Sequence, residues 1–193
     1  MSTDDPALIS RAQRGDVSAF EALVQPHQQS LLRLILATNR NPDDAQDCLQ
    51  EALISAYRAI PRFRCESGFR TWLCRIALNV TRNWIRAEAR ASAQRFRQDP
   101  LRILSPASTN IDENLLREDD ANTIRRALAA LPAHYRDVLL LRYYSDLPYD
   151  EIARALELPV GTVRSRLSEG RRLLLQRLTA LGYIPTAKEA QPR

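Results

Sequence analysis

The sequence predicts an all-α fold in which two small helical domains are joined by a flexible linker. Apolar residues recur every three or four positions along most of the chain, as they do in amphipathic helices. Only 5 of the 193 residues are glycine, which argues against a turn-rich all-β fold. One stretch contains proline, serine and acidic residues without a sustained period. We therefore expect domains at residues 1–91 and 119–182, a linker at 92–118 and a disordered tail at 183–193.

The first domain is expected to contain five helical segments with recognisable starts or stops. Gly15 ends the first segment and Pro61 ends the fourth, because neither residue sustains a helix. Pro26 interrupts the chain after the second segment, and Pro42 lies where the fourth begins. The segments are residues 5–14, a helix capped by Asp16 or Ser18, residues 31–37, residues 42–60 and residues 69–90.

The second domain ends in two short amphipathic patterns that flank a tight break near Pro159. Before them, Pro132 separates a helix that starts near Asp119 from another over residues 135–143. The last pattern has an inner apolar face of Val163, Leu167, Gly170 and Leu174, and outer faces that carry Thr162, Arg164, Ser165, Ser168, Arg171 and Arg172. Such a pair predicts a helix-turn-helix whose second helix enters the major groove of DNA. The alternative is an ordinary helical hairpin with a solvated basic face.

The charge distribution also indicates nucleic acid. The chain has a net charge of +5, and Lys188 is its only lysine. Residues 62–97 carry 9 basic and 2 acidic side chains, and residues 121–182 carry 10 and 6. Between them, residues 98–120 have a net charge of −4. Two basic blocks separated by an acidic one are typical of two nucleic-acid-facing surfaces, although a solvated face and a coding bias toward arginine remain open alternatives.

A stripe of polar and acidic residues on the fourth segment is the first candidate binding site. Its members, which share one helix face through spacings of three, four, seven and eight residues, are Asp43, Asp44, Asp47, Gln50 and Glu51. Like charges on one face cost stability, so the stripe favours a basic protein partner. The helix dipole offers an alternative explanation for acids in the first turn. Acid–base catalysis is not favoured, because no histidine lies near the stripe in sequence.

The loop and helix over residues 62–90 form a second candidate site. Arginines here alternate with Phe63, Phe69, Trp72 and Trp84. Arginine can follow a phosphate backbone while rings and pockets receive unstacked bases, so the mixture indicates single-stranded nucleic acid. In the alternative interpretation, Phe69 and Trp72 belong to the core and the arginines are solvated.

Several other classes of protein find no support in the sequence. There is no secretory signal and no apolar run long enough to span a bilayer, so a cytoplasmic protein is expected. Cys48, Cys65 and Cys74 lack metal-site spacing and are expected to be free thiols, two of them packed in helices. No phosphate loop, catalytic triad or metal cluster is visible, so we expect neither a cofactor nor an enzyme.

Three segments resemble a known family. DDAQDCLQEALISAYRAI, FRCESGFRTWLCRIALNVTRNWIR and LPYDEIARALELPVGTVRSRL are similar to regions 2.2, 2.3–2.4 and 4.2 of the extracytoplasmic-function (ECF) sigma factors of bacterial RNA polymerase. The resemblance covers about residues 5–180, with the regions in the family's order. It departs from the family after VRSRL, where many relatives carry an aromatic or basic pair and this chain has Ser168 and Glu169.

The resemblance implies a function for each candidate site. The stripe over residues 43–51 would bind the β′ clamp helices of core RNA polymerase, and the protein would also meet the β subunit. The linker would thread near the polymerase active site, and the helix-turn-helix would bind the −35 promoter element. An anti-sigma factor, membrane-anchored in some systems, would hold the protein inactive. The −10 element would be captured and melted by Arg62, Phe63, Arg64, Ser67, Phe69, Arg70, Asn79, Arg82 and Arg86.

A conventional activator or repressor with a sensor domain is the competing interpretation. The first domain discriminates between the two, because a sensor needs a ligand pocket or a phosphoacceptor. This chain has the acidic stripe and the arginine-rich aromatic helix instead, which favours the sigma factor.

Overall fold

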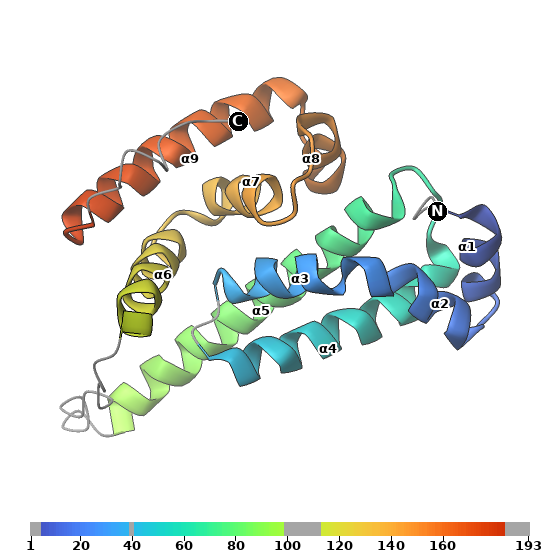
Figure 1. Cartoon of the computed structure of the whole chain (residues 1–193), viewed down its shortest axis with the longest axis horizontal. Coiled ribbons are helices and arrows are strands. Elements are labelled where there is room, and N and C mark those ends of the chain that lie inside the picture. Colours follow the sequence, from blue (N-terminus) through green and yellow to red (C-terminus); the bar gives the residue numbers. More distant parts are fainter. Residues whose placement is uncertain (1–4, 39–40, 99–112, 184–193) are drawn as a thin grey trace.

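The computed structural model describes residues 5–38, 41–98 and 113–183. Within these ranges every regular element is a helix, which confirms the predicted fold class. Figure 1 shows α3, α4 and α5 side by side, with α1 and α2 packed at one end. The remaining helices α6, α7, α8 and α9 lie along one side of this group. The expected tail from residue 184 onward lies outside the described residues.

Three helices of the N-terminal domain begin at side chains that cap free backbone N–H groups. Asp5 accepts a hydrogen bond from Ala7, Asp16 from Ala19 and Asn41 from Asp43. Caps of this kind supply partners that the first turn of a helix otherwise lacks. The helices are α1 (Pro6–Gln13), α2 (Val17–Val24), α3 (Gln28–Leu36), α4 (Pro42–Ala59) and α5 (Phe69–Gln98), with 3-10 turns at Gln25–His27 and Ile60–Arg62.

Small residues let the two long helices of this domain approach closely. The buried face of α4 is Ala45, Cys48, Leu49, Ala52 and Ala56, at spacings of three and four residues. This face packs against α5, whose fully buried residues include Phe69, Leu73 and Ala77. Burying such apolar faces is the main favourable contribution to folding, so the predicted helical spacing accounts directly for the core.

The C-terminal domain is built from four helices, of which the last three follow prolines. Pro132, Pro148 and Pro159 precede α7, α8 and α9 respectively. Gly170 on α9 permits a close approach to α7, since a Cβ at this position would lie 3.3 Å from Leu139. The helices are α6 (Glu113–Ala129), α7 (Ala133–Tyr143), α8 (Tyr149–Leu156) and α9 (Val160–Ala180).

Helical structure extends into both ends of the expected linker. α5 continues to Gln98, and α6 begins at Glu113. No proline or glycine interrupts the chain from residue 69 to 98, and residues 90–98 are rich in arginine, alanine and glutamine. These residues have a high intrinsic propensity for helix even without a buried face. The helix therefore continues beyond residue 90, where the repeating pattern of apolar residues stops. Residues 99–112 lie outside the described part of the chain.

None of the described helices combines the length and the apolar character that crossing a bilayer requires. The described residues also contain no group of three or more His, Cys, Asp or Glu side chains that could hold a metal ion.

Candidate nucleic-acid interface

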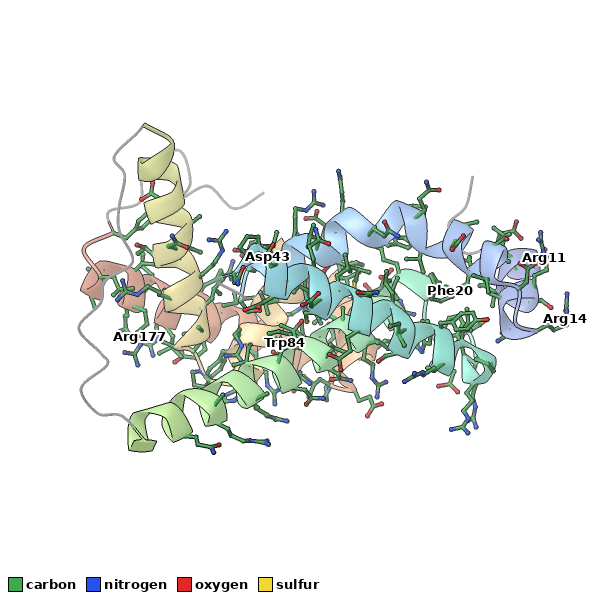
Figure 2. The ribbon with its side chains drawn as sticks, turned by 90° about the horizontal axis from the view of Figure 1, so that it is seen from below. Arg11, Arg14, Phe20, Asp43, Trp84 and Arg177 are labelled. Atoms are coloured by element: carbon green, nitrogen blue, oxygen red, sulfur yellow. The ribbon has the colours of Figure 1, made fainter. Side chains whose placement is uncertain are left out.

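The acidic stripe of α4 lies on the surface of the N-terminal domain. Asp43, Asp47, Gln50 and Glu51 are exposed, and Asp44 is half-buried. Figure 2 shows Asp43 at the start of α4, with Trp84 on the neighbouring α5. The indole N–H of Trp84 donates a hydrogen bond of 3.3 Å to Glu51 and orients that carboxylate. The helix therefore presents a row of mostly exposed acceptors, one of them oriented by Trp84, of the kind that a basic protein surface recognises.

The loop before α5 rests on a cluster of aromatic rings. The ring centroids of Phe63 lie 4.9 Å from Trp72 and 6.0 Å from Phe69. Phe69 is fully buried and Phe63 is only 7% exposed. These two members of the predicted DNA-binding set thus lie in the core and support the loop from beneath, and both also contribute to the lining of a hollow beside the loop. Arg62 and Arg64 are exposed, as a direct contact with nucleic acid requires.

A hollow of about 370 Å³ opens between this loop and α1. The loop contributes Cys65 and Ser67 to its lining, and α1 contributes Ser10 and Gln13. The amide of Gln13 donates a hydrogen bond of 2.8 Å to the carbonyl of Phe63 and holds the loop in place. No local sequence pattern points to the two α1 residues, because only the tertiary fold brings α1 beside a loop fifty residues away.

Arginines along α5 already have partners within the protein. Arg82 donates 3.0 Å hydrogen bonds from Nη1 to the Asn79 side chain and from Nε to Asp137 of the other domain. Arg70 donates to the carbonyl of Ser145. Arg86 is exposed. Arg82 thus joins Asn79 to Asp137 of the C-terminal domain, whereas Arg70 contacts that domain separately, at Ser145.

The outer face of α9 matches the pattern that predicted a helix-turn-helix. Val163, Leu167 and Gly170 are buried and Leu174 is half-buried, so the predicted inner face is confirmed. The Ser165 hydroxyl donates a 3.0 Å hydrogen bond to the carbonyl of Thr162. Its lone pairs stay free to accept from a base. Thr162 is half-buried, and the exposed outer residues are Arg164, Ser165, Ser168, Arg171 and Arg172.

Glu169 forms an ion pair within α9. Its carboxylate accepts hydrogen bonds of 2.9 and 2.6 Å from Arg172, three residues along the helix. The hydrogen bond from Arg172 lowers the pKa of Glu169, and the same pair raises the pKa of Arg172. One predicted DNA-contacting arginine is thus partly neutralised by the residue that departs from the family pattern.

The turn between α8 and α9 contains a strained residue. Glu157 adopts the left-handed conformation with φ 55°, where glycine is the common residue after a helix. Its side chain lies 2.7 Å from Arg75 of α5. The residue therefore serves the turn and the contact between domains at once.

The three cysteines differ in accessibility. Cys48 and Cys74 are buried in α4 and α5, whereas Cys65 is exposed in the loop. Burial raises the pKa of the Cys48 thiol to about 11 and also raises the pKa of Cys74. The prediction that two thiols are packed in helices is confirmed.

Comparisons with known families match both domains. The family model for Sigma-70 region 2 matches residues 23–91, and the model for Sigma-70, region 4, matches residues 121–174. The first match argues against a sensor domain at the N-terminus. The acidic stripe, the loop and most of α5 fall within region 2, and the helix pair α8–α9 falls within region 4 up to residue 174.

Full-length relatives agree with these matches. The chain is 37% identical over 188 residues to the RNA polymerase sigma-H factor of Pseudomonas aeruginosa, covering 92% of this chain and 95% of that protein. It is 35% identical over 180 residues to the ECF RNA polymerase sigma-E factor of Escherichia coli strain K12, covering 88% and 92%.

Solved structures share the fold. CnrH, in complex with the cytosolic domain of CnrY, aligns with a TM-score of 0.68 at 23% identity over 93% of this chain and 99% of that one. RpoE of Bartonella quintana, crystallised with the anti-sigma factor NepR, aligns with a TM-score of 0.55 at 22% identity over 82% and 98%. Two region matches and full-length relatives converge on one assignment. The chain belongs to the ECF sigma factors, which direct transcription initiation by bacterial RNA polymerase.

Proposed function

We propose that each of three surfaces performs one part of sigma-factor function in this chain. The acidic stripe of α4 binds the β′ clamp helices of core polymerase. The loop 62–68 and the adjoining face of α5 bind the −10 element, and the outer face of α9 binds the −35 element. The observation that carries the proposal is the exposed row Arg164, Ser165, Ser168 and Arg171 above a buried inner face, because side chains at the front of such a helix reach base edges.

The proposed −10 surface combines a hollow with cations at its rim. Arg64, whose side chain is 83% exposed, lies on the same loop as the hollow-lining residues Cys65 and Ser67. A hollow beside arginines suits an unstacked base and its phosphate. Phe63 and Phe69 support this surface by fixing the loop, and Gln13 ties the loop to α1.

We also propose that a protein of the anti-sigma class binds this chain, in soluble or membrane-anchored form. Family membership supports this partner, and so do the two solved structures, which are complexes, one of them with the anti-sigma factor NepR. The protein works beside RNA polymerase in the cytoplasm and acts by binding, with no catalytic residue or cofactor of its own.

The proposed polymerase contact is tested by reversing one charge on the stripe. Asp47→Arg should lower capture of core polymerase at least about tenfold, because it places a cation opposite the basic clamp. Folding should change little, since Asp47 is exposed. Glu21→Arg is the matched control, because Glu21 is an exposed acid on α2, outside the stripe.

Capture is measured by pull-down, and far-UV circular dichroism checks the fold. Equal capture by the two variants would show that the stripe is only solvated surface. In a parallel assay, promoter binding should require core polymerase. Nanomolar sequence-specific binding by the isolated chain at physiological salt would indicate a conventional regulator instead.

A further inference from the structure

Direct polar contacts cross between the two domains along α5. Both Nε and Nη2 of Arg82 reach Asp137 Oδ2, at 3.0 and 2.5 Å. The Thr71 hydroxyl donates to Glu151 at 2.5 Å, and Arg75 lies 2.7 Å from Glu157. Together with the bond from Arg70 to the Ser145 carbonyl, these contacts span about three turns of one helix.

The contacts have a consistent direction. In the four pairs just named, α5 supplies the donor and the C-terminal domain supplies the acceptor. Three of the acceptors are carboxylates, and they contact the face of α5 that carries arginines predicted to meet DNA. They belong to Asp137, Glu151 and Glu157. We call these three residues the closure acids. Asp137 and Glu157 contact arginines, and Glu151 contacts Thr71. An anionic carboxylate oxygen accepts from a guanidinium as a phosphate oxygen does, so Asp137 and Glu157 can substitute for promoter phosphates at these two arginines.

The Arg82–Asp137 pair is the strongest of these contacts. The side chain of Asp137 is 4% exposed and that of Arg82 is 28% exposed, so solvent screens this pair weakly. The second oxygen, Oδ1 of Asp137, is buried without a hydrogen-bond partner among the described residues. Without Arg82, neither carboxylate oxygen of Asp137 would have a hydrogen-bond partner in the described part of the chain, and a buried carboxylate without such partners is unfavourable. Its cross-domain partner Arg82 therefore gives the best physical account of an acid at this position. The Arg75–Glu157 pair is exposed on both sides and contributes less.

We propose that the free protein closes on itself, with the closure acids of region 4 holding the arginine face of α5 so that this face is unavailable to promoter DNA until the domains separate. This rests on the proposed −10 role of α5. Arg70, Arg82 and the Arg82-bound Asn79 belong to the proposed −10 surface, so closure and −10 binding exclude each other. The domains remain tethered on opening. Fourteen residues lie between Gln98 and Glu113, and a segment of that length extends to at most roughly 50 Å.

The test compares Asp137→Asn with Asp150→Asn in the full-length chain. The first change removes the charge that holds Arg82. The second removes an acid whose partner, Arg154, lies on its own helix at 2.9 Å. Small-angle X-ray scattering should show a larger radius of gyration only for Asp137→Asn. Because Asp137 is buried, Glu157→Arg offers a second, exposed route to opening, and Arg75→Glu combined with it should restore closure.

The functional readout is affinity for a short mixed-sequence single-stranded DNA, measured by fluorescence anisotropy. If the open form is about one-tenth of the free protein, releasing it tightens the apparent Kd by up to about tenfold. Expansion with tighter DNA binding supports the proposal. Unchanged scattering in both Asp137→Asn and Glu157→Arg would overturn it, and so would expansion without tighter binding. Capture of core polymerase by the wild type tests the sigma function separately, because it does not depend on the closure acids.

Discussion

The arginines of α9 and those of α5 differ in what already surrounds them. On α9, Arg164 and Arg171 point outward and are exposed. On α5, Arg70 and Arg82 are bound to acceptors from the other domain. The C-terminal surface can therefore meet DNA in the structure as it stands, whereas the part of the N-terminal surface that contains Arg70 and Arg82 must first be released. This difference suggests that −35 contacts precede −10 contacts when the protein engages a promoter.

The largest expected effect concerns the exposed helix. Arg164→Ala should change the preference at one −35 base pair by about 10- to 100-fold, because a lost bidentate contact to a base is worth about 1–3 kcal/mol. Arg171→Ala, about two turns further along, should lower transcription from all −35 sequences alike and flatten the salt dependence. Reconstituted transcription from a panel of −35 variants distinguishes the two. A uniform decrease with Arg164→Ala would mean that α9 is rotated about its axis relative to our placement.

A smaller effect is expected on the N-terminal surface. Arg64→Ala and Asn79→Ala should reduce promoter opening by about tenfold, which corresponds to a hydrogen bond to a charged group worth about 1.5 kcal/mol. Initial docking should change less, because the −35 helix is intact. Permanganate footprinting of unpaired thymines measures the opening. Arg33→Ala, which removes an exposed arginine from α3, is the matched control; normal bubbles with both test variants would remove these residues from the −10 surface.

The smallest expected effect comes from the ion pair on α9. Glu169→Gln should release Arg172 and raise promoter affinity about twofold without changing base preference, since exposed pairs are weak and screened by salt. The gain should disappear when Arg172→Ala is added, because the released cation is then missing. Affinity for a promoter fragment in the presence of core polymerase, titrated with salt, provides the measurement. A gain that survives in the double variant would place the effect of Glu169 outside this pair.

The sequence was most informative where a single periodic pattern decided the structure. The inner face of α9 could be predicted because Val163, Leu167 and Gly170 recur at helical spacing. The Glu169–Arg172 pair was also within reach, since residues three apart on a helix are neighbours. Phe69 was ambiguous, because an aromatic residue among arginines fits both a binding loop and a core. Only the structure shows that it is fully buried.

Contacts between distant segments could not be predicted. Gln13 lies fifty residues from the loop that it holds, and Asp137 lies 55 residues from Arg82. No local pattern encodes such pairs, because they depend on how the helices pack. The helical ends of the expected linker were missed for a different reason. Residues 92–98 favour helix through their intrinsic propensity. They lack regularly spaced apolar residues, so a search for amphipathic patterns does not detect them.

Two requirements conflict at Glu157: a relaxed backbone in the turn and a carboxylate that reaches Arg75. A glycine there would adopt the same left-handed conformation without the steric cost that a Cβ brings, and would so relax the turn of the helix-turn-helix. The same change would delete the carboxylate that meets Arg75. Evolution toward a more stable DNA-binding domain and evolution toward a tighter resting state therefore pull in opposite directions at this position. An acidic residue at this position keeps the cross-domain contact at the expense of backbone strain.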